Sequence, residues 1–396
     1  MIETVLNYAE MRALARRRLP RGLFEYIDRG TEDEVALAAM GAAWDRLKLN
    51  PAVLVDVSQR THDTELFGRR IGLPVVIAPT ALAGLVWHDG ETALARAAAR
   101  ADIPFCVSTQ SVTSIERIAR SGARLWFQLY VWRDRALTFR LLDRVRDAGA
   151  EALVLTVDTA VGPNREYNIR NGFGMPIRPS LRAAIDVLSR PRWLAGVLLR
   201  QLIADGVPSY AHYPPEFKTR VTRPAVADAL RLDDRVCWAD VAALRRYWRG
   251  PFLLKGVLRV DDARRALDAG VDGIVVSSHG GRNLDSARPS ADALTEIVAA
   301  VGDRLTVLVD SGVRRGSHVA KALALGAKAV LVGRATLYGT AVAGEAGATR
   351  MLDILRDELD RTMGLIGRPT IASIGSDCVW PEERIAATAD GGVESA

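Results

Sequence analysis

The sequence of 396 residues has few of the features that mark membrane-spanning, secreted or metal-binding proteins. It lacks a run of about 18 uninterrupted apolar residues, the least that predicts a transmembrane helix. Its three cysteines, an odd number without metal-ligand spacing, indicate inert thiols rather than a disulfide framework or a zinc site. The N-terminal segment carries acidic residues where a secretory signal has its apolar core. These absences predict an intracellular protein.

Lysine is also scarce, since it supplies only five of the 53 basic residues. The formal net charge of +6 would suit a nucleic-acid partner. Such proteins usually gather their basic residues on one stripe, often between aromatic side chains, whereas the arginines here are spread along the whole chain. We therefore expect no nucleic-acid partner. The content of 49% hydrophobic and 25% charged residues is typical of a globular protein.

After the first seventy residues, short apolar runs alternate with helical stretches rich in alanine and leucine. Because the runs are continuously apolar, they predict strands that are buried on both faces. Eight strand–helix units are typical of a barrel, whereas an open doubly wound sheet usually has fewer strands and a glycine-rich turn after the first. The sequence therefore predicts an α/β fold of the (β/α)8 TIM barrel class. The predicted strands cover residues 73–79, 104–108, 125–130, 152–158, 252–256, 273–278, 306–311 and 329–333.

Two regions lie outside the eightfold pattern. Residues 1–70 predict an N-terminal helical extension, and the connection after the fourth strand is too long for one loop and one helix. We place an insertion at residues 174–240, where apolar and basic residues alternate between 180 and 206. That pattern fits an active-site lid, a segment on a membrane surface or ordinary packing against the barrel. The barrel with its extension is expected to span residues 1–375, followed by a C-terminal tail at 376–396.

In a barrel of this class, the active site is built from residues at the C-terminal ends of the strands. The predicted strands end in polar or small residues, among them a lysine, acids and a histidine. In strand order these residues are Pro79, Thr80, Ala81, Ser108, Gln128, Tyr130, Thr156, Asp158, Lys255, Ser277, His279, Asp310, Gly333 and Arg334. Their convergence predicts a catalytic site at this end of the barrel.

The motif SSHGGRNLD (277–285) is the most specific of these signals. It places a base, His279, and a cation, Arg282, after one strand, and the glycines between them let the backbone approach a ligand closely. Asp158, at another strand end, is suited to support the histidine. Arg165 and Arg282 together suit a substrate carboxylate, which prefers planar bidentate donors.

The loops after the seventh and eighth strands predict a phosphate site, because backbone N–H groups there commonly bind phosphate in this fold. They carry the sequences DSGVRRG (310–316) and VGRA (332–335). The candidate contacts are Asp310, Gly312, Arg314, Gly333 and Arg334. A phosphate-bearing cofactor is the favoured interpretation, and the alternative is a pair of tight turns.

Lys255 ends an apolar strand, where a lysine is costly unless it meets an anion or acts chemically. The residues alone leave several functions open. One is a phosphate-cofactor oxidoreductase, and another is an isomerase or aldolase that uses Lys255 as a Schiff base. A catalytically silent membrane-surface protein is a third, although folding by itself would not require His279, Asp158, Arg165 and Arg282.

From about Leu19 to Gly375 the sequence resembles the FMN-dependent 2-hydroxy-acid oxidases and dehydrogenases, above all those of the mandelate dehydrogenase type. The resemblance rests on YIDRGTEDE (26–34), LVDVSQR (54–60), LWFQLYV (125–131), the HGGR motif and LALGAKAVLVGRATLYG (323–339). It implies FMN as the cofactor and oxidation of a mandelate-like 2-hydroxy acid, or of L-lactate, to the 2-keto acid. It further implies a quinone or oxygen as electron acceptor, a homotetramer, and a cytoplasmic protein with peripheral contact to the inner face of the cell membrane.

The resemblance also implies roles for individual residues. His279 would be the active-site base, Asp158 would support it, and Tyr130 would hydrogen-bond the substrate oxygen. The substrate carboxylate would be bound by Tyr26, Arg165 and Arg282. FMN would contact Pro79, Thr80, Ala81, Ser108, Gln128, Thr156, Lys255 and Ser277, with its phosphate at Asp310, Gly312, Arg314, Gly333 and Arg334.

Two positions depart from the family pattern. Asn283 stands where glutamine is usual, and Ser278 stands where asparagine is common. Both flank the catalytic motif without replacing a residue of it. The resemblance also places Ala81, Gln110 and Val161 around the substrate side chain, where the small residues favour a bulky or aromatic substrate.

Overall fold

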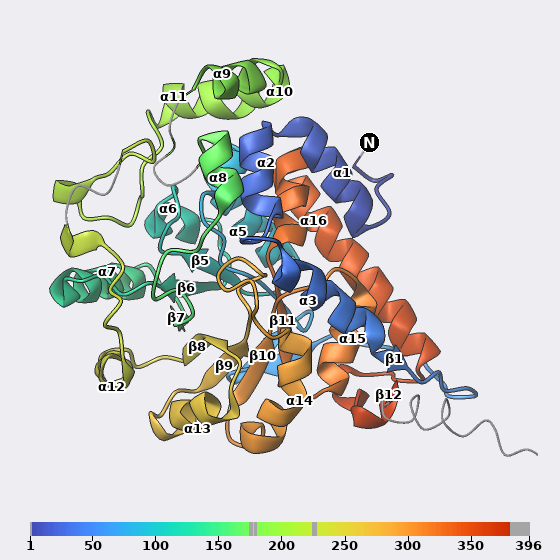
Figure 1. Cartoon of the computed structure of the whole chain (residues 1–396). Helices are drawn as coiled ribbons and strands as arrows, with labels where there is room; N and C mark the ends of the chain where they lie inside the picture. The colour runs from blue at the N-terminus through green and yellow to red at the C-terminus, as the bar shows by residue number, and fades with distance from the viewer. Residues whose placement is uncertain (1, 174–176, 178–179, 224–227, 381–396) are drawn as a thin grey trace, which may run out of the picture.

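Eight parallel strands close into a barrel in the computed structural model of the chain (Figure 1). The structure describes residues 2–173, 177, 180–223 and 228–380. The barrel strands are β4 (Val75–Ile77), β5 (Phe105–Ser108), β6 (Leu125–Leu129), β7 (Ala152–Thr156), β8 (Phe252–Val257), β9 (Gly273–Val276), β10 (Thr306–Val309) and β11 (Ala329–Val332). They pair in sequence order, and β11 pairs with β4 to close the barrel. All eight predicted strands and the predicted fold class are confirmed.

Helices surround the barrel and explain why its strands are continuously apolar. They are α5 (Gly90–Arg100), α6 (Ile115–Ala119), α7 (Arg135–Asp147), α12 (Trp238–Tyr247), α13 (Val260–Asp268), α14 (Ser290–Val301), α15 (Gly316–Ala324) and α16 (Arg334–Leu365). Side chains that point outward from the strands pack against these helices. Those that point inward form a separate interior cluster, so each strand is buried on both faces.

The N-terminal extension contributes three helices and a hairpin. The helices α1 (Tyr8–Arg18), α2 (Arg21–Asp28) and α3 (Val35–Arg46) lie beside α16 and the C-terminal end of the barrel (Figure 1). The hairpin of β2 (Thr64–Leu66) and β3 (Arg69–Ile71) covers the opposite end, where Leu66, Phe67 and Ile71 join the interior cluster. The predicted helical extension is therefore confirmed, and it also contains this hairpin.

The described part of the connection between β7 and α12 carries helices that lie in the upper part of the view (Figure 1). It contains α8 (Glu166–Asn171), α9 (Leu181–Leu188) and a continuous helix made of α10 (Pro191–Trp193), a π-helical turn (Leu194–Leu199) and α11 (Arg200–Ala204). The backbone N–H of Gly22 donates to Asp186 over 3.4 Å, which ties α9 to α2. Within the predicted insertion, residues 174–176, 178–179 and 224–227 lie outside the described residues.

The end of the described chain returns to the extension. The strand β12 (Val379–Trp380) pairs antiparallel with β1 (Lys48–Leu49). Residues 376–380 of the predicted tail therefore pack on the fold, and residues 381–396 lie outside the described part. Within the described ranges, we find no helix that combines the length and the apolar character needed to cross a membrane.

Candidate active site

A cavity of about 1190 Å³ lies at the C-terminal end of the barrel, beneath the helices of the extension. Its size leaves room for a cofactor and a substrate together, since single-ligand pockets measure roughly 300–1,000 Å³. The predicted site residues that line it are Tyr26, Pro79, Thr80, Ala81, Ser108, Gln128, Tyr130, Thr156, Arg165, Lys255, His279, Arg282, Asp310, Gly312, Arg314, Gly333 and Arg334. The structure thus brings strand ends from the whole barrel to one site.

His279 and Asp158 form a hydrogen-bonded pair at this site. Nδ1 of His279 lies 2.8 Å from Oδ1 of Asp158. Burial alone would raise the pKa of Asp158, but His279 and Lys255 outweigh it and hold that pKa below its ordinary value. The ionised carboxylate can only accept, so Nδ1 carries the proton and Nε2 is the free basic nitrogen. The pair is therefore built to accept a proton at Nε2 of His279, which lines the cavity.

The backbone that presents His279 is unusual. His279, Gly280 and Gly281 all have positive φ angles, of 54°, 67° and 67°. For a histidine this conformation costs on the order of 1–3 kcal/mol and must be held by its surroundings. The backbone N–H of His279 donates to Oγ of Ser277 over 3.0 Å, and a side chain at Gly281 would collide with Leu37 of α3. The HGG sequence is thus required by this turn and its close contact with α3.

Ser277 is not on the cavity wall, where the resemblance had placed it. Its side chain is fully buried, and its Oγ accepts from the backbone of His279 and from Nζ of Lys255 over 2.9 Å. Ser277 follows β9 and supports both the backbone of His279 and the side chain of Lys255 through these hydrogen bonds.

Lys255 forms a buried ion pair with Asp310. Its Nζ lies 2.9 Å from Oδ2 of Asp310, and the lysine is only 5% exposed. Burial opposes the charge of Lys255, but Asp310 and Asp158 outweigh it and raise the lysine pKa above its ordinary value. A lysine that stays protonated is a poor Schiff-base nucleophile, so the structure disfavours the isomerase or aldolase alternative.

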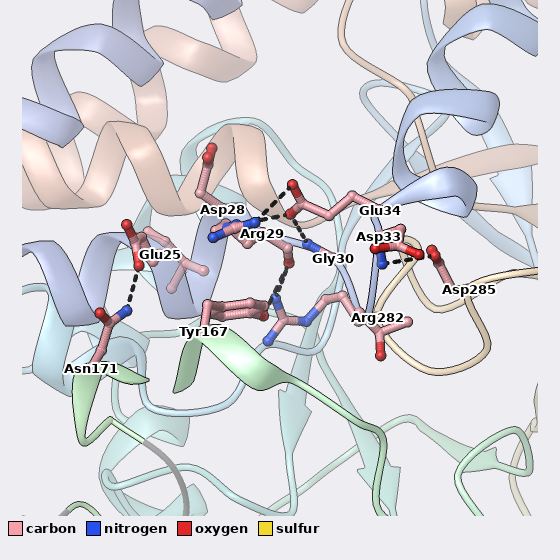
Figure 2. Close-up of polar contacts among 12 residues, drawn as sticks. Glu25, Asp28, Arg29, Gly30, Asp33, Glu34, Tyr167, Asn171, Arg282 and Asp285 are labelled. Carbon is pink, nitrogen blue, oxygen red and sulfur yellow. Dashed lines mark hydrogen bonds and ion pairs between the residues drawn. The ribbon is translucent and has the colours of Figure 1, made fainter. Parts of the chain in front are cut away.

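Arg165 and Arg282 place two cations beside each other at the cavity mouth (Figure 2 shows Arg282). Burial, together with Arg282, lowers the pKa of Arg165 to about 10, which still leaves it charged at neutral pH. Among the described residues, neither guanidinium forms an ion pair with a carboxylate. Instead Nε of Arg165 donates to the carbonyl of Arg282, and Arg282 lies over the ring of Tyr26 at 5.3 Å. Two partly buried cations without an acidic partner are suited to an anionic ligand.

Tyr130 lies at the same site as a neutral phenol. Burial raises its pKa to about 12, and the negative charge of Asp158 adds to this effect. At neutral pH its hydroxyl group therefore keeps its proton and can donate a hydrogen bond to a ligand oxygen.

The polar atoms of the cavity floor fit the isoalloxazine ring of FMN. Oγ1 of Thr80 and Nε2 of Gln128 are buried without a hydrogen-bond partner in the part of the chain that the structure describes. Oε1 of Gln128 accepts from Oγ of Ser108 over 3.2 Å, which directs Nε2 away from that serine. Buried polar groups are rarely left unsatisfied, so a polar ligand is expected here. With Lys255 adjacent, these groups match a planar ring with donors and acceptors on its edge.

The residues expected at the FMN phosphate contact the N-terminal extension as well as the cavity. Nε of Arg334 donates to the carbonyl of Ile27, and its Nη2 donates to the carbonyls of Arg29 and Gly280. The guanidinium of Arg314 lies over the ring of Tyr8 at 5.7 Å. The family resemblance assigns only Tyr26 of the extension to the site, and the helical pattern of residues 1–70 does not indicate these further contacts.

One residue lies away from its expected place, and another makes a contact that the sequence does not indicate. Val161 is 73% exposed and does not line the cavity, whereas Ala81 and Gln110 do. Asn283, noted only as a departure from the family, donates from Nδ2 to the carbonyl of Asp158 and to Oγ1 of Thr159, both over 2.8 Å. It therefore helps to hold Asp158 in place, and no local sequence signal could have indicated this contact.

No group of three or more His, Cys, Asp or Glu side chains suited to a metal ion occurs within the described ranges.

Comparisons with known proteins agree with this geometry. Residues 15–381 match the family model of FMN-dependent dehydrogenases. The chain is 39% identical to (S)-mandelate dehydrogenase of Pseudomonas putida, over 96% of this chain and 95% of that protein. It is 42% identical to an L-lactate dehydrogenase of Caulobacter vibrioides, over 93% of this chain and 96% of that protein.

The similarity extends to solved structures. The crystal structure of the monotopic membrane protein (S)-mandelate dehydrogenase superposes with a TM-score of 0.90 at 38% identity, covering 96% of this chain and all of that one. A mandelate oxidase with (S)-mandelic acid gives a TM-score of 0.79 at 37% identity, covering 95% and 98%. With a matching cavity and a family model over nearly its whole length, the chain belongs to the FMN-dependent dehydrogenase family and is an FMN-dependent oxidoreductase of the 2-hydroxy-acid dehydrogenase type.

Proposed function

We propose that the chain oxidises an aryl 2-hydroxy acid of the (S)-mandelate type to its 2-keto acid and passes the electrons to a quinone or to oxygen. The observation that carries this proposal is the pair of cations Arg165 and Arg282, which lines the same cavity as the His279–Asp158 pair. The two cations suit the substrate carboxylate, and Nε2 of His279 suits the substrate hydroxyl group.

In this proposal each residue has a defined task. Arg165 and Arg282, with Tyr26, bind the carboxylate and so orient the carbon that bears the hydroxyl group. His279 takes the hydroxyl proton at Nε2, and the ionised Asp158 stabilises the imidazolium that results. Tyr130 donates a hydrogen bond to the same substrate oxygen. FMN would be held by Thr80, Gln128 and Lys255 and, when bound, would supply the two-electron oxidation of the substrate carbon.

Anaerobic bleaching of the flavin by a panel of 2-hydroxy acids tests the reaction and ranks the substrates. L-Lactate is the second candidate, because the lactate dehydrogenase relative is as similar as the mandelate dehydrogenase one. Reoxidation of the bleached protein by a quinone, compared with oxygen, identifies the acceptor. Bleaching by none of these acids would refute the proposed function. The implied homotetramer remains a prediction that light scattering of the holoenzyme can test.

The preference for an aromatic side chain should depend on Gln110. The small Ala81 and the flexible Gln110 line the cavity and leave room beside the substrate carbon. We expect kcat/KM to be higher for mandelate than for glycolate or lactate, and Gln110→Trp to reverse this order by filling the space. One ring edge or methylene is worth about 1–3 kcal/mol, so the change should be about 10- to 200-fold. A tenfold preference of the wild type for glycolate would contradict the proposed substrate class.

We infer that the insertion makes peripheral contact with a membrane, and the cytoplasmic side is implied by the family resemblance alone. Leu181, Ile185 and Leu188 on α9 are 79%, 61% and 67% exposed. Trp193 and Val197 on the following helix are buried, and Nε1 of Trp193 donates to the carbonyl of Leu85. The insertion therefore packs against the barrel through one set of apolar residues and presents another set to its surroundings. Such a surface, with arginines nearby, suits anionic lipids.

A vesicle experiment tests this contact. We expect the holoenzyme to sediment with anionic vesicles at low salt. A triple variant should abolish sedimentation because it removes the apolar anchor; it combines Leu181→Ser, Ile185→Ser and Leu188→Ser. Val53 and Leu54 are 80% and 104% exposed elsewhere on the molecule, so serine at both serves as the control. Equal sedimentation of both variants would exclude α9 as the anchor.

A further inference from the structure

The two motifs at residues 26–34 and 277–285 meet at the N-terminal end of α3 (Figure 2). This helix has no side-chain cap of its own, and its N-cap residue, Glu34, has a φ of 65°. Asp285 supplies the missing acceptor from the loop after β9. Its two carboxylate oxygens accept the backbone N–H groups of Asp33 and Ala36, each over 3.1 Å. A carboxylate at a helix N-terminus is stabilised both by these donors and by the helix dipole.

Asp285 is 5% exposed, so these hydrogen bonds are protected from water. The same two segments are also joined on the other side of the turn. The backbone N–H of Thr31 donates to the carbonyl of Gly281 over 3.1 Å, and a Cβ at Gly30 would come within 2.7 Å of that oxygen. The turn between α2 and α3 is therefore fixed to the catalytic loop at two points.

The fixed turn presents the carbonyl of Arg29, which accepts from three side chains of three different elements. Figure 2 shows two of them, Tyr167 and Arg282, at this carbonyl. Nη1 of Arg282 donates to it over 2.9 Å, and Oη of Tyr167 and Nη2 of Arg334 donate over 3.3 Å each. The carboxylate of Glu34 accepts from the Arg29 guanidinium and from the N–H of Gly30, which stiffens the turn further. The Arg29 carbonyl is thus the direct hydrogen-bond partner of the Arg282 guanidinium.

We propose that Asp285 is a positioning residue for substrate-carboxylate recognition: by fixing the turn at residues 29–36, it holds the Arg29 carbonyl where it orients Arg282. The inference rests on the proposed function, in which Arg282 binds the carboxylate. Asp285 does not line the cavity, so in this proposal it acts through the turn. Without its carboxylate, two buried N–H groups lose their acceptor and the turn can shift.

The test compares a 2-hydroxy acid with its amide, which lacks the negative charge that Arg282 recognises. In the FMN-loaded enzyme, Asp285→Ala should lower kcat/KM for the acid about tenfold, chiefly by raising KM. A tenfold change is the usual size of the effect when a buried hydrogen-bond acceptor is lost. The value for the amide should change less than twofold. In an Arg282→Ala background, Asp285→Ala should leave the acid-to-amide ratio unchanged, because the effect passes through Arg282.

The control is Asp292→Ala. Asp292 lies on α14 and forms an ion pair with Arg46 at the far end of α3. Its replacement should therefore leave the acid-to-amide ratio of kcat/KM unaltered. Asp285→Asn retains one acceptor oxygen and should give an intermediate ratio, which also serves if the alanine variant does not fold. An equal loss for acid and amide would overturn the inference alone. A wild-type enzyme without preference for the acid over the amide would instead refute the proposed carboxylate site.

Discussion

Replacing His279 by glutamine should slow flavin reduction by the 2-hydroxy acid by about two to four orders of magnitude, the usual contribution of a general base. Glutamine is of similar size but cannot take up the hydroxyl proton. The ionised Asp158, 2.8 Å from Nδ1, would then lose the imidazolium that it stabilises. Stopped-flow measurement of flavin bleaching under anaerobic conditions gives the rate directly.

The same variant should still bind FMN, because the polar groups expected at the ring, Thr80, Gln128 and Lys255, are untouched. The ratio of flavin to protein absorbance checks this. His62→Gln is the matched control: Nε2 of His62 lies 3.0 Å from Asp360, so it is also paired with a carboxylate, but it lies outside the cavity. Flavin reduction by the His279 variant at the wild-type rate would remove His279 from the mechanism.

Replacing Arg165 by methionine should lower kcat/KM for the acid by about two to three orders of magnitude. Loss of one partner of a buried, hydrogen-bonded charge pair costs about 2–5 kcal/mol. The pKa of Arg165, lowered by burial to about 10, reflects how little water surrounds it, so a bound carboxylate would have few alternative donors. Methionine retains most of the packing and removes only the charge and its donors.

Steady-state kinetics across a substrate series is the measurement for this variant. Arg170→Met is the control, because Arg170 lies on α8, the helix directly after Arg165, is exposed and pairs with Glu166 one turn earlier. The inhibition constant of a non-reacting carboxylate should rise in parallel with the loss of kcat/KM. An unchanged inhibition constant would show that Arg165 does not bind the substrate carboxylate.

The barrel could be predicted from the sequence because its signal is local. Each strand is a short continuous apolar run, and runs such as ALVLTVD (152–158) need no distant partner to be recognised. The polar residues at the strand ends could be placed in one site for a related reason. Once eight parallel strands form a barrel, their C-terminal ends must meet on the same face. His279, Asp158, Lys255 and Arg282 were found in this way.

Strand-end reasoning could not show which of these side chains also bind a neighbour in the fold. Ser277 stands at a strand end like the others, yet its hydroxyl supports His279 and Lys255. Val161, which the family resemblance places near the substrate side chain, is 73% exposed and does not line the cavity. The contact of Ser277 with Lys255 joins residues 22 positions apart in the chain, so it becomes visible only in the fold.

The sequence by itself determined the barrel, the family and the set of chemical groups at the strand ends, because short stretches of neighbouring residues suffice to identify each of them. Only the tertiary structure decided how the extension at residues 1–70 completes the site. Asp285 meets the backbone of Ala36 across 249 positions of chain, and Arg282 meets the carbonyl of Arg29 across 253. Such hydrogen bonds involve backbone atoms that every residue has, so neither the residue type nor the spacing in the sequence predicts them.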